Sequence, residues 1–364
     1  MSSNSTDDSA GAAQGSAAPT MSVGITTDNQ TNAAERRAKG EFVRGVSSVR
    51  HWIGTSPQYP AEAGRYHLYV AKNCPWCHRV LLGRAVLGLT AAISVDVLFP
   101  NRSNDDEPRG GGLWKFCPEG QTGQNHRFVS FPSCTADTVH GKRYVKEIYE
   151  MVGVQDQKSV PILYDKKTKT IVNNESAEIL RMMGTAMRHL GQHGDKDNTT
   201  VELYPADKAG VIDELNDWIY TDVANGSYKA GFSSNQDTYE EAYRKYFAAL
   251  DRLDTILADN RFLVGDSVTE ADLRLFPPLF RMDPVYYTRF KLNKHFLWHY
   301  RNLWRWMGDM MALPGMEEDG VADQEYLQHC KQGYFGRTGN GTVPVGPEGY
   351  PECYREPHWS HETK

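Results

Sequence analysis

The sequence lacks any apolar stretch close to the roughly 18–20 residues that a helix needs to cross a bilayer. Its N-terminus also lacks the basic segment followed by an apolar one that marks a secretory signal. Residues 1–41 are instead rich in small and polar residues, so we expect a disordered N-terminal tail. We therefore expect a cytoplasmic protein that has no membrane partner.

Basic residues are not in excess either. The net charge at pH 7 is −6, and Lys and Arg form no continuous stripe, so a nucleic-acid partner has little support. Cysteine is scarce as well, since six cysteines in 364 residues are too few for a disulfide framework. A closely spaced cysteine pair in such a chain more often indicates catalysis or a metal than a structural bridge.

The first half of the chain alternates between strand and helix patterns. Residues 66–70 are aromatic and β-branched, apolar residues then recur at helical spacing from Trp76, and a second strand pattern covers 93–98. A strand, a helix and a strand in this order predict a parallel βαβ unit. After a long predicted loop at 99–140, the patterns predict a helix at 144–151, strands at 160–164 and 170–172, and a helix at 175–183. This order, β-α-β-α-β-β-α, predicts a thioredoxin-like domain over residues 42–190.

Beyond residue 190 the strand patterns stop. Apolar residues recur at helical spacing, as in 237–258, so residues 191–335 are predicted to form an all-helical domain. Thr269 to Asp272 has the arrangement of a capping box, which begins a long apolar helix. We expect Pro277 and Pro278 to interrupt or kink that helix. The last segment, 336–364, is rich in Gly and Pro and is predicted to be an extended tail without regular structure.

The most informative motif reads Cys-Pro-Trp-Cys-His from Cys74 to His78, where the first strand meets the first helix. Cys74 is placed at the helix N-terminus, where unpaired backbone N–H groups and the helix dipole stabilise a negative charge. Pro75 suits the first helical turn, because its missing N–H group is not needed there. The motif therefore predicts a thiolate nucleophile at neutral pH.

Three other interpretations of this motif compete. Cys-x-x-Cys-His also matches a c-type haem attachment site, which requires export and an axial ligand. A zinc site requires a second Cys/His pair, and the spacing of Cys117 and Cys134 does not fit one. The third is a purely structural pair of buried cysteines. Cys77 itself is open to two interpretations: it is either a resolving partner of Cys74 or a small buried residue.

Several segments together resemble the glutathionyl-hydroquinone reductases, which are the xi class of glutathione transferases and relatives of the omega class. The matching segments are 65–70, 74–76, 114–116, 159–163, 174–179, 225–232, 272–276, 281–286, 290–293 and 341–347. The resemblance runs from about Phe42 to Pro347. It implies the glutathione-transferase fold, in which an α/β thioredoxin-like domain precedes an all-α C-terminal domain. It also implies glutathione as co-substrate, no metal, and a homodimer.

The resemblance further implies a glutathione site. Val160 precedes Pro161, which should be cis and should present the Val160 backbone to the cysteinyl backbone of glutathione. Ser176 and the first amides of its helix suit the γ-glutamyl carboxylate, and Glu175 suits the α-amino group. The same two residues are also a plausible helix cap. Trp114 matches a residue that stacks over glutathione, although a tryptophan there could equally fix a loop onto the core.

Two phenols complete the implied site. Tyr228 and Tyr286 match residues that line the pocket for an aromatic substrate, where either could donate or orient a proton. On helical faces both could also be core residues. The sequence departs from the family where Cys77 replaces the usual alanine and where Lys158, an implied glutathione contact, replaces an arginine. The lysine weakens any bidentate contact with a carboxylate.

The implied reaction is the glutathione-dependent reduction of a glutathionyl-quinol. The Cys74 thiolate attacks the glutathione sulfur, releases the hydroquinone and is left as a mixed disulfide, which a second glutathione then reduces. The enzymatic alternatives are an omega-like thiol transferase or dehydroascorbate reductase, and a dithiol oxidoreductase that uses Cys74 and Cys77. The non-enzymatic alternative is an interaction module of the same fold. The retained nucleophile and the Glu175–Ser176 pair count against this last alternative.

Overall fold

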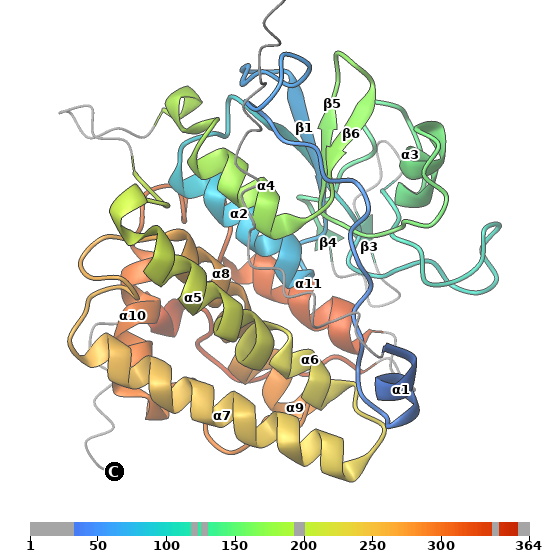
Figure 1. The fold of residues 1–364 in the computed structure, drawn as a ribbon. Helices are drawn as coiled ribbons and strands as arrows, with labels where there is room; N and C mark the ends of the chain where they lie inside the picture. Colours follow the sequence, from blue (N-terminus) through green and yellow to red (C-terminus); the bar gives the residue numbers. More distant parts are fainter. Residues whose placement is uncertain (1–32, 118–122, 125–129, 193–200, 337–341, 356–364) are drawn as a thin grey trace, which may run out of the picture.

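The computed structural model describes residues 33–117, 123–124, 130–192, 201–336 and 342–355. Its N-terminal domain is built on a four-stranded sheet in the order β2-β1-β5-β6 (Figure 1). The strands are β1 (Tyr66–Val70), β2 (Ser94–Val97), β5 (Ile162–Asp165) and β6 (Thr170–Asn173). β1 runs parallel to β2, whereas β5 is antiparallel to both β1 and β6. The predicted βαβ unit and hairpin are therefore confirmed.

The apolar residues of β1 explain its central position. Leu68 pairs with Val95 of β2 on one side and with Leu163 of β5 on the other. All five residues of the strand are buried, because neighbouring strands and helices cover both faces. The strand leads directly into the loop that carries Cys74, so the position of the cysteine is fixed by the middle of the sheet.

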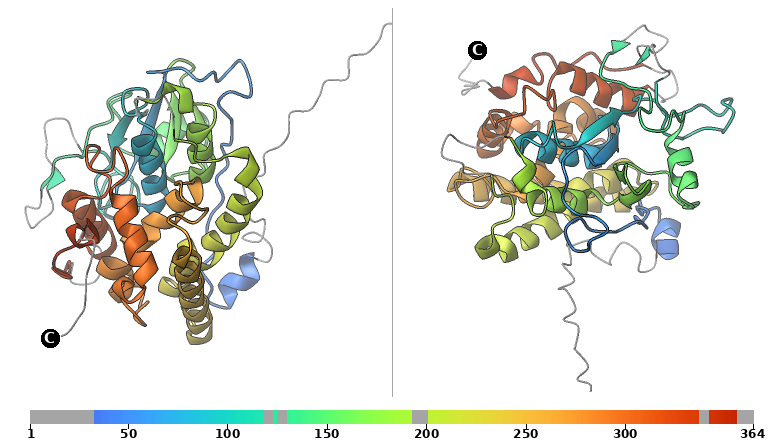
Figure 2. Two further views of the ribbon diagram at one scale, coloured as in Figure 1. Left: turned by 90° about the vertical axis from the view of Figure 1, so that its left-hand side faces the viewer. Right: turned by 90° about the horizontal axis from the view of Figure 1, so that it is seen from above.

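Three helices complete this domain. Helices α2 (Pro75–Val86) and α4 (Ser176–Gly184) pack together on one face of the sheet, and α3 (Val145–Met151) lies on the other (Figures 1 and 2). The predicted order β-α-β-α-β-β-α is confirmed. The segment expected to be a long loop adds a short antiparallel pair of strands, β3 (Gly123–Gln124) and β4 (Ser130–Phe131).

In its described residues, the C-terminal half consists of helices joined by loops and turns, and no β-strand is assigned there. Its α-helices are α5 (Ala209–Trp218), α6 (Gly226–Gly231), α7 (Gln236–Ala258), α8 (Glu270–Phe280), α9 (Tyr287–Arg289), α10 (Arg301–Met311) and α11 (Gln324–Phe335). Short π-helical turns, η4 (Ile219–Ala224) and η5 (Met282–Tyr286), follow α5 and α8. No helix in the described part of the chain combines the length and apolarity required to cross a membrane.

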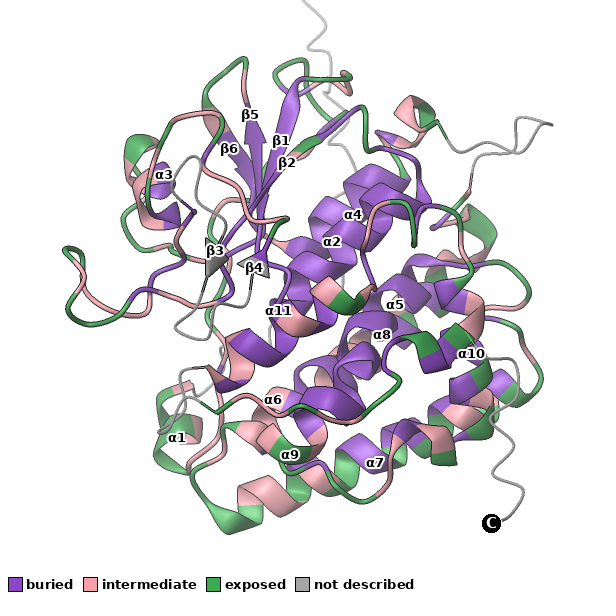
Figure 3. Ribbon diagram, turned by 180° about the vertical axis from the view of Figure 1, so that it is seen from behind, coloured by how far each residue is buried: buried purple, intermediate pink, exposed green. Residues whose placement is uncertain are grey.

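Helix α8 joins the two domains. It packs against α2, and every residue of both helices is buried, as the continuous purple of Figure 3 shows. The predicted capping box at its start is present, with the Asp272 carboxylate accepting the Thr269 N–H at 2.9 Å. Pro277 and Pro278 do not interrupt the helix, which continues to Phe280. The two prolines cannot donate backbone hydrogen bonds to the preceding turn. Packing against the surrounding core on all sides of α8 compensates for these missing bonds.

The two ends of the chain contain more structure than the sequence predicts. Within the tail expected to be disordered, the described part includes a short helix, α1 (Ala33–Ala38), and residues 1–32 lie outside the described residues. The C-terminal segment was also expected to lack regular structure, and this expectation is wrong. A 3₁₀ turn, η7 (Glu352–Arg355), packs Tyr354 against Trp304 of α10 with ring centroids 4.8 Å apart. Aromatic burial therefore anchors a segment that its Gly and Pro content marks as irregular.

Candidate active site

A cavity of about 730 Å³ lies where the thioredoxin-like domain faces the helical domain. Cys74, Trp114, Lys158, Val160, Glu175, Ser176 and Tyr228 from the sequence analysis all line it. Phe42, Arg44, Arg102, Phe232, Arg289 and Tyr334 line it as well. Tyr286 is not among the described residues that line the cavity. The structure thus brings seven of the eight predicted site residues to one cavity.

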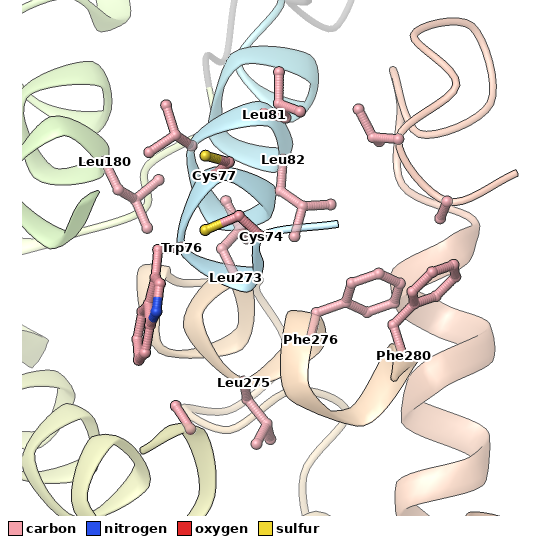
Figure 4. Packing of buried hydrophobic residues seen from close by; sticks show 14 of the residues in the cluster. Cys74, Trp76, Cys77, Leu81, Leu82, Leu180, Leu273, Leu275, Phe276 and Phe280 are labelled. Atoms are coloured by element: carbon pink, nitrogen blue, oxygen red, sulfur yellow. The ribbon is translucent and has the colours of Figure 1, made fainter. Parts of the chain in front are cut away.

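Cys74 occupies the N-cap position of α2, and Pro75 begins the helix, as predicted. The cysteine is only 9% exposed, yet it lines the cavity. Leu273 and Phe276 of α8 and Leu180 of α4 belong to the apolar cluster around it (Figure 4). The nucleophile is thus held in a rigid wall between the two domains.

The surroundings of Cys74 favour the thiolate. Burial alone would raise the pKa of the thiol, but hydrogen bonds from the Cys77 side chain and backbone, the Arg44 charge and the Trp76 backbone amide outweigh it. Together they lower the pKa of Cys74 to about 6. The Arg44 guanidinium carbon lies 3.7 Å from the centroid of the Trp76 ring, which holds this charge close to the thiolate. Cys74 is therefore mostly ionised at neutral pH.

Cys77 is fully buried one helical turn further along α2. Burial, together with its hydrogen bond to Cys74 and the charge of the Cys74 thiolate, raises the pKa of Cys77 well above the usual range. Cys77 is therefore a protonated thiol whose S–H group donates a hydrogen bond to the Cys74 sulfur. This contact stabilises the nucleophile, and it also places the two sulfurs close to each other.

His78 takes no part in the chemistry of the motif. Arg281 Nη1 donates to His78 Nδ1 at 2.8 Å, so the other ring nitrogen, Nε2, donates to the Val321 carbonyl at 2.6 Å. Burial lowers the pKa of His78 well below its usual value, and the ring is neutral. Arg281 Nη2 also donates to the Lys72 carbonyl at 2.8 Å, which fixes the loop before Cys74. Both ring nitrogens are occupied by the protein, which argues against haem attachment or zinc binding through this motif.

The wall beside Cys74 is formed by Val160 and Pro161. The peptide bond between them is cis, as the resemblance predicts. The Val160 carbonyl oxygen lies 3.9 Å from Cys74 Sγ. A peptide whose backbone paired with Val160 would therefore have a side chain next to the cysteine sulfur.

Glu175 and Ser176 lie at the start of α4, where the helix cap that the sequence left open is present. The Glu175 carboxylate accepts the Ala177 N–H at 3.2 Å and so caps the helix, and it accepts the Ser47 hydroxyl at 3.1 Å. Ser176 Oγ is 3.4 Å from the same carboxylate. Because both residues line the cavity, the cap itself is the surface that a ligand would meet.

Trp114 and Lys158 flank this surface. Trp114 is 6% exposed and packs in the main core, yet it also lines the cavity. The Arg102 guanidinium carbon lies 4.2 Å from its ring centroid, so a cation–π contact with another residue of the cavity lining holds the ring. Lys158 is exposed at the rim of the cavity.

The opposite wall is made of phenols. Tyr228 lines the cavity, and its hydroxyl shares a short hydrogen bond with the hydroxyl of Tyr334 on α11. Tyr286 is fully buried, and its hydroxyl lies 3.4 Å from that of Tyr334. Burial raises the pKa of all three phenols, so each is neutral at physiological pH. The structure does not place Tyr286 on the cavity surface, where it was expected; its hydroxyl contacts that of Tyr334, which does line the cavity.

Comparison with known proteins agrees with this geometry. The glutathione S-transferase N-terminal domain matches residues 73–186, and the glutathione S-transferase C-terminal domain matches residues 236–309. Glutathionyl-hydroquinone reductase YqjG of Escherichia coli is 38% identical over 323 residues, which cover 85% of this chain and 89% of that protein. The chain belongs to the glutathione S-transferase family.

Two solved structures place the chain within that family. The xi-class glutathione transferase of Phanerochaete chrysosporium is 37% identical and aligns with a TM-score of 0.74, covering 86% of this chain and 94% of that one. The glutathione-bound structure of Escherichia coli YqjG is 38% identical and aligns with a TM-score of 0.72, covering 86% and 96%. The resemblance to xi-class transferases is therefore confirmed over most of the chain.

Several residues of this glutathione transferase site escaped the sequence analysis. Tyr334 and Arg289 reach the cavity from the helical domain, and Arg44 reaches it from the segment before β1. Gly333 is needed for the close approach of α11, since a side chain there would lie 1.9 Å from Asn73 Nδ2, next to Cys74. These residues lie in segments far from the motif along the chain, and no local pattern in the sequence indicates that they meet it.

Proposed function

We propose that this glutathione transferase is a reductase that removes glutathione from glutathionyl-hydroquinones. The observation that carries the proposal is a single thiolate, Cys74, placed between two different walls of one cavity. One wall offers backbone and helix N-terminal groups suited to a peptide, and the other offers phenols suited to an aromatic ring. The relative from Escherichia coli is named for this activity.

In the first step, the Cys74 thiolate attacks the sulfur of the conjugate. The new bond joins Cys74 Sγ to the glutathione sulfur, and the carbon–sulfur bond to the aromatic ring breaks. The electron pair of that bond stays on the ring carbon, which takes a proton and leaves as the hydroquinone. We propose Tyr228 as the proton donor or orienting group, with Tyr334 and Tyr286 as the hydrogen-bonded phenols behind it.

In the second step, the thiolate of another glutathione attacks the mixed disulfide. Oxidised glutathione leaves and the Cys74 thiolate is restored, so the sum is conjugate plus glutathione giving hydroquinone plus oxidised glutathione. Glutathione is thus the co-substrate. We propose that Val160, Glu175, Ser176, Trp114 and Lys158 hold it.

A second candidate function rests on the contact between Cys77 and Cys74. If Cys77 attacked the mixed disulfide, the protein would be a dithiol oxidoreductase and the conjugate would not be its characteristic substrate. Full burial and a raised pKa make Cys77 a poor nucleophile, so we favour the route through Cys74 alone. An omega-like thiol transferase or dehydroascorbate reductase would use the same Cys74 chemistry on a different acceptor.

Turnover of the hydroquinone form of glutathionyl-menadione with excess glutathione separates these possibilities. We expect wild type and Cys77→Ser to release menadiol at similar rates and Cys74→Ala to be inactive. Reduction of a glutathionyl mixed disulfide and of dehydroascorbate is measured on the same samples. Activity on those two substrates alone, or activity that disappears in Cys77→Ser, would contradict the proposal.

Two further expectations are part of the proposal. No disulfide joins cysteines within the described chain, which suits a reducing compartment such as the cytoplasm. A homodimer is expected from the family, and sedimentation at micromolar concentration tests it.

A further inference from the structure

A second pair of cysteines lies outside the cavity. Cys117 is 5% exposed and packs with Phe99 and Phe131 in a small apolar cluster that is separate from the main core. Cys134 is only half-buried and packs against the same cluster. The two residues follow the segment that bears Trp114 and the end of β4, respectively. Neither takes part in the mechanism proposed above.

The backbone holds these two cysteines side by side. The Cys117 N–H donates to the carbonyl of Thr135, the residue after Cys134, at 3.0 Å. Cys134, the chain neighbour of Thr135, packs against the same apolar cluster as Cys117. We expect this proximity to suit the roughly 4.4–6.8 Å between Cα atoms that a disulfide spans.

The two sulfurs already interact. Their side chains share a hydrogen bond, in which Cys134 is the donor, and the Cys134 thiol is also 3.5 Å from the Leu98 carbonyl. This hydrogen bond, which outweighs burial, and the Lys115 charge lower the pKa of Cys117, while Cys134 holds its proton more tightly. Two sulfurs joined by a hydrogen bond are placed for disulfide formation.

A metal site does not account for the pair. No group of three or more His, Cys, Asp and Glu side chains suited to a metal occurs among the described residues. A structural zinc needs four such ligands. Simple core packing does not account for it either, because Cys134 is partly open to solvent and its sulfur faces another sulfur.

We propose that Cys117 and Cys134 form a second, non-catalytic redox site that reacts with glutathione disulfide. Cys134 is the more exposed sulfur and receives the first glutathione. Ionised Cys117 takes the proton of Cys134 along their shared hydrogen bond, so the more exposed Cys134 sulfur becomes the attacking thiolate despite its raised pKa. The Cys134 thiolate attacks glutathione disulfide, a Cys134–glutathione bond forms, and one glutathione leaves. Cys117 then loses its proton and attacks the Cys134 sulfur, and the second glutathione leaves. The sum is two thiols plus glutathione disulfide giving one protein disulfide plus two glutathione molecules.

The location gives such a bridge a consequence for the cavity. Cys117 lies three residues after Trp114. The neighbour of Cys134, Ser133, donates its N–H to the Glu325 carboxylate of α11 at 2.9 Å. A disulfide would therefore tie the segment that carries Trp114 to a segment already attached to α11.

The test is to incubate the full-length protein with glutathione disulfide, block free thiols with an alkylating reagent, and map the peptides. We expect a peptide pair linked through Cys117 and Cys134 that disappears on adding reduced glutathione. In Cys117→Ser we expect Cys134 to retain a glutathione that it cannot release. Glutathionylation of Cys74 in the same sample is the internal reference for oxidant strength.

One result would overturn the inference. If Cys117 and Cys134 are both alkylated at every glutathione ratio at which Cys74 carries glutathione, the pair is not a redox site. Wild-type protein alone decides this point, so a folding defect in Cys117→Ser would not obscure it. Lasting glutathione on Cys134 of the wild type, without the linked peptide, would contradict the role of Cys117. None of these outcomes depends on whether quinol conjugates are substrates.

Discussion

Cys74 Sγ lies 3.9 Å from the carbonyl oxygen of Val160. The nucleophile at the start of α2 therefore faces the residue before the cis proline at the start of β5. These residues are 86 positions apart, and the central strand β1 brings them together because it leads into Cys74 and pairs with β5. A sulfur carried by a peptide bound along Val160 would arrive next to the thiolate.

The hydrogen bond from Cys77 should determine much of the acidity of Cys74. The pKa of Cys74 is lowered to about 6, so the thiolate form, and with it kcat/KM, should be retained above that pH and lost as the pH falls through it. In Cys77→Ala the donor is gone, and we expect the acidic limb of the pH profile to move up by roughly 1 unit. Cys77→Ser retains a hydroxyl donor and is the matched control. An unchanged profile in Cys77→Ala would show that Cys77 does not stabilise the thiolate.

Tyr228 is the phenol that reaches the cavity, so its hydroxyl should matter most for protonation of the leaving ring. We expect Tyr228→Phe to lower kcat for glutathionyl-menadione by about 10- to 100-fold with a smaller effect on KM. Tyr243→Phe, a half-buried phenol on α7 that does not line the cavity, should behave as wild type. If the two variants have equal activity, the Tyr228 hydroxyl has no part in the proton transfer.

Ser176 should contribute to glutathione binding and not to the chemical step. Removing one hydrogen bond to a bound carboxylate in Ser176→Ala should raise KM for glutathione by roughly 10-fold. The pH dependence attributed to Cys74 should stay as in wild type, because Glu175 still caps α4. Steady-state kinetics with varied glutathione provide both values. A fall in kcat without a change in KM would place Ser176 in the chemistry instead.

Asp283 should make the stability of the fold depend on pH. Burial raises the pKa of its carboxyl to about 7, although the hydroxyl of Tyr350 and the Leu297 N–H both donate to it. An unfolded aspartate has a pKa near 4, so between about pH 4 and 7 the folded state binds a proton that the unfolded chain does not. The contribution of this group to stability therefore decreases as the pH rises through that range, by roughly 2–4 kcal/mol.

Chemical denaturation at pH 5, 6, 7 and 8 of wild type and Asp283→Asn measures this effect. The difference between the two proteins isolates Asp283 from the other titrating groups. We expect the difference in unfolding free energy to grow with pH in favour of Asp283→Asn. A difference that does not vary with pH would mean that Asp283 is ionised in the folded protein.

The sequence predicts most of the N-terminal domain because its signals are local. The alternation of β1, α2 and β2, the position of Cys74 before Pro75, and the Thr269 capping box all depend on residues within a few positions of one another. The same holds for Val160 and Glu175, which stand next to a proline and at a helix start. Secondary structure and motif positions that depend on neighbouring residues can be predicted from the sequence without a structure.

The rest of the site depends on contacts between distant segments. Tyr334 lines the cavity, and Tyr286 does not, because α11 packs beside η5. The apolar periodicity of the sequence does not indicate that these two segments meet. Arg44 stabilises the Cys74 thiolate from a segment that precedes the first strand. Tyr354 anchors a tail whose Gly and Pro content predicts no regular structure, because aromatic burial outweighs that local preference.

The central claim is that Cys74 alone accepts glutathione from the conjugate. The most direct measurement mixes the protein with one equivalent of glutathionyl-menadione in its reduced form, without free glutathione, and identifies the products by mass spectrometry. We predict one equivalent of released menadiol and a glutathione attached to Cys74 by a disulfide, in wild type and in Cys77→Ser. A menadione ring attached to Cys74, or a Cys74–Cys77 disulfide as the product in wild type, would contradict the account.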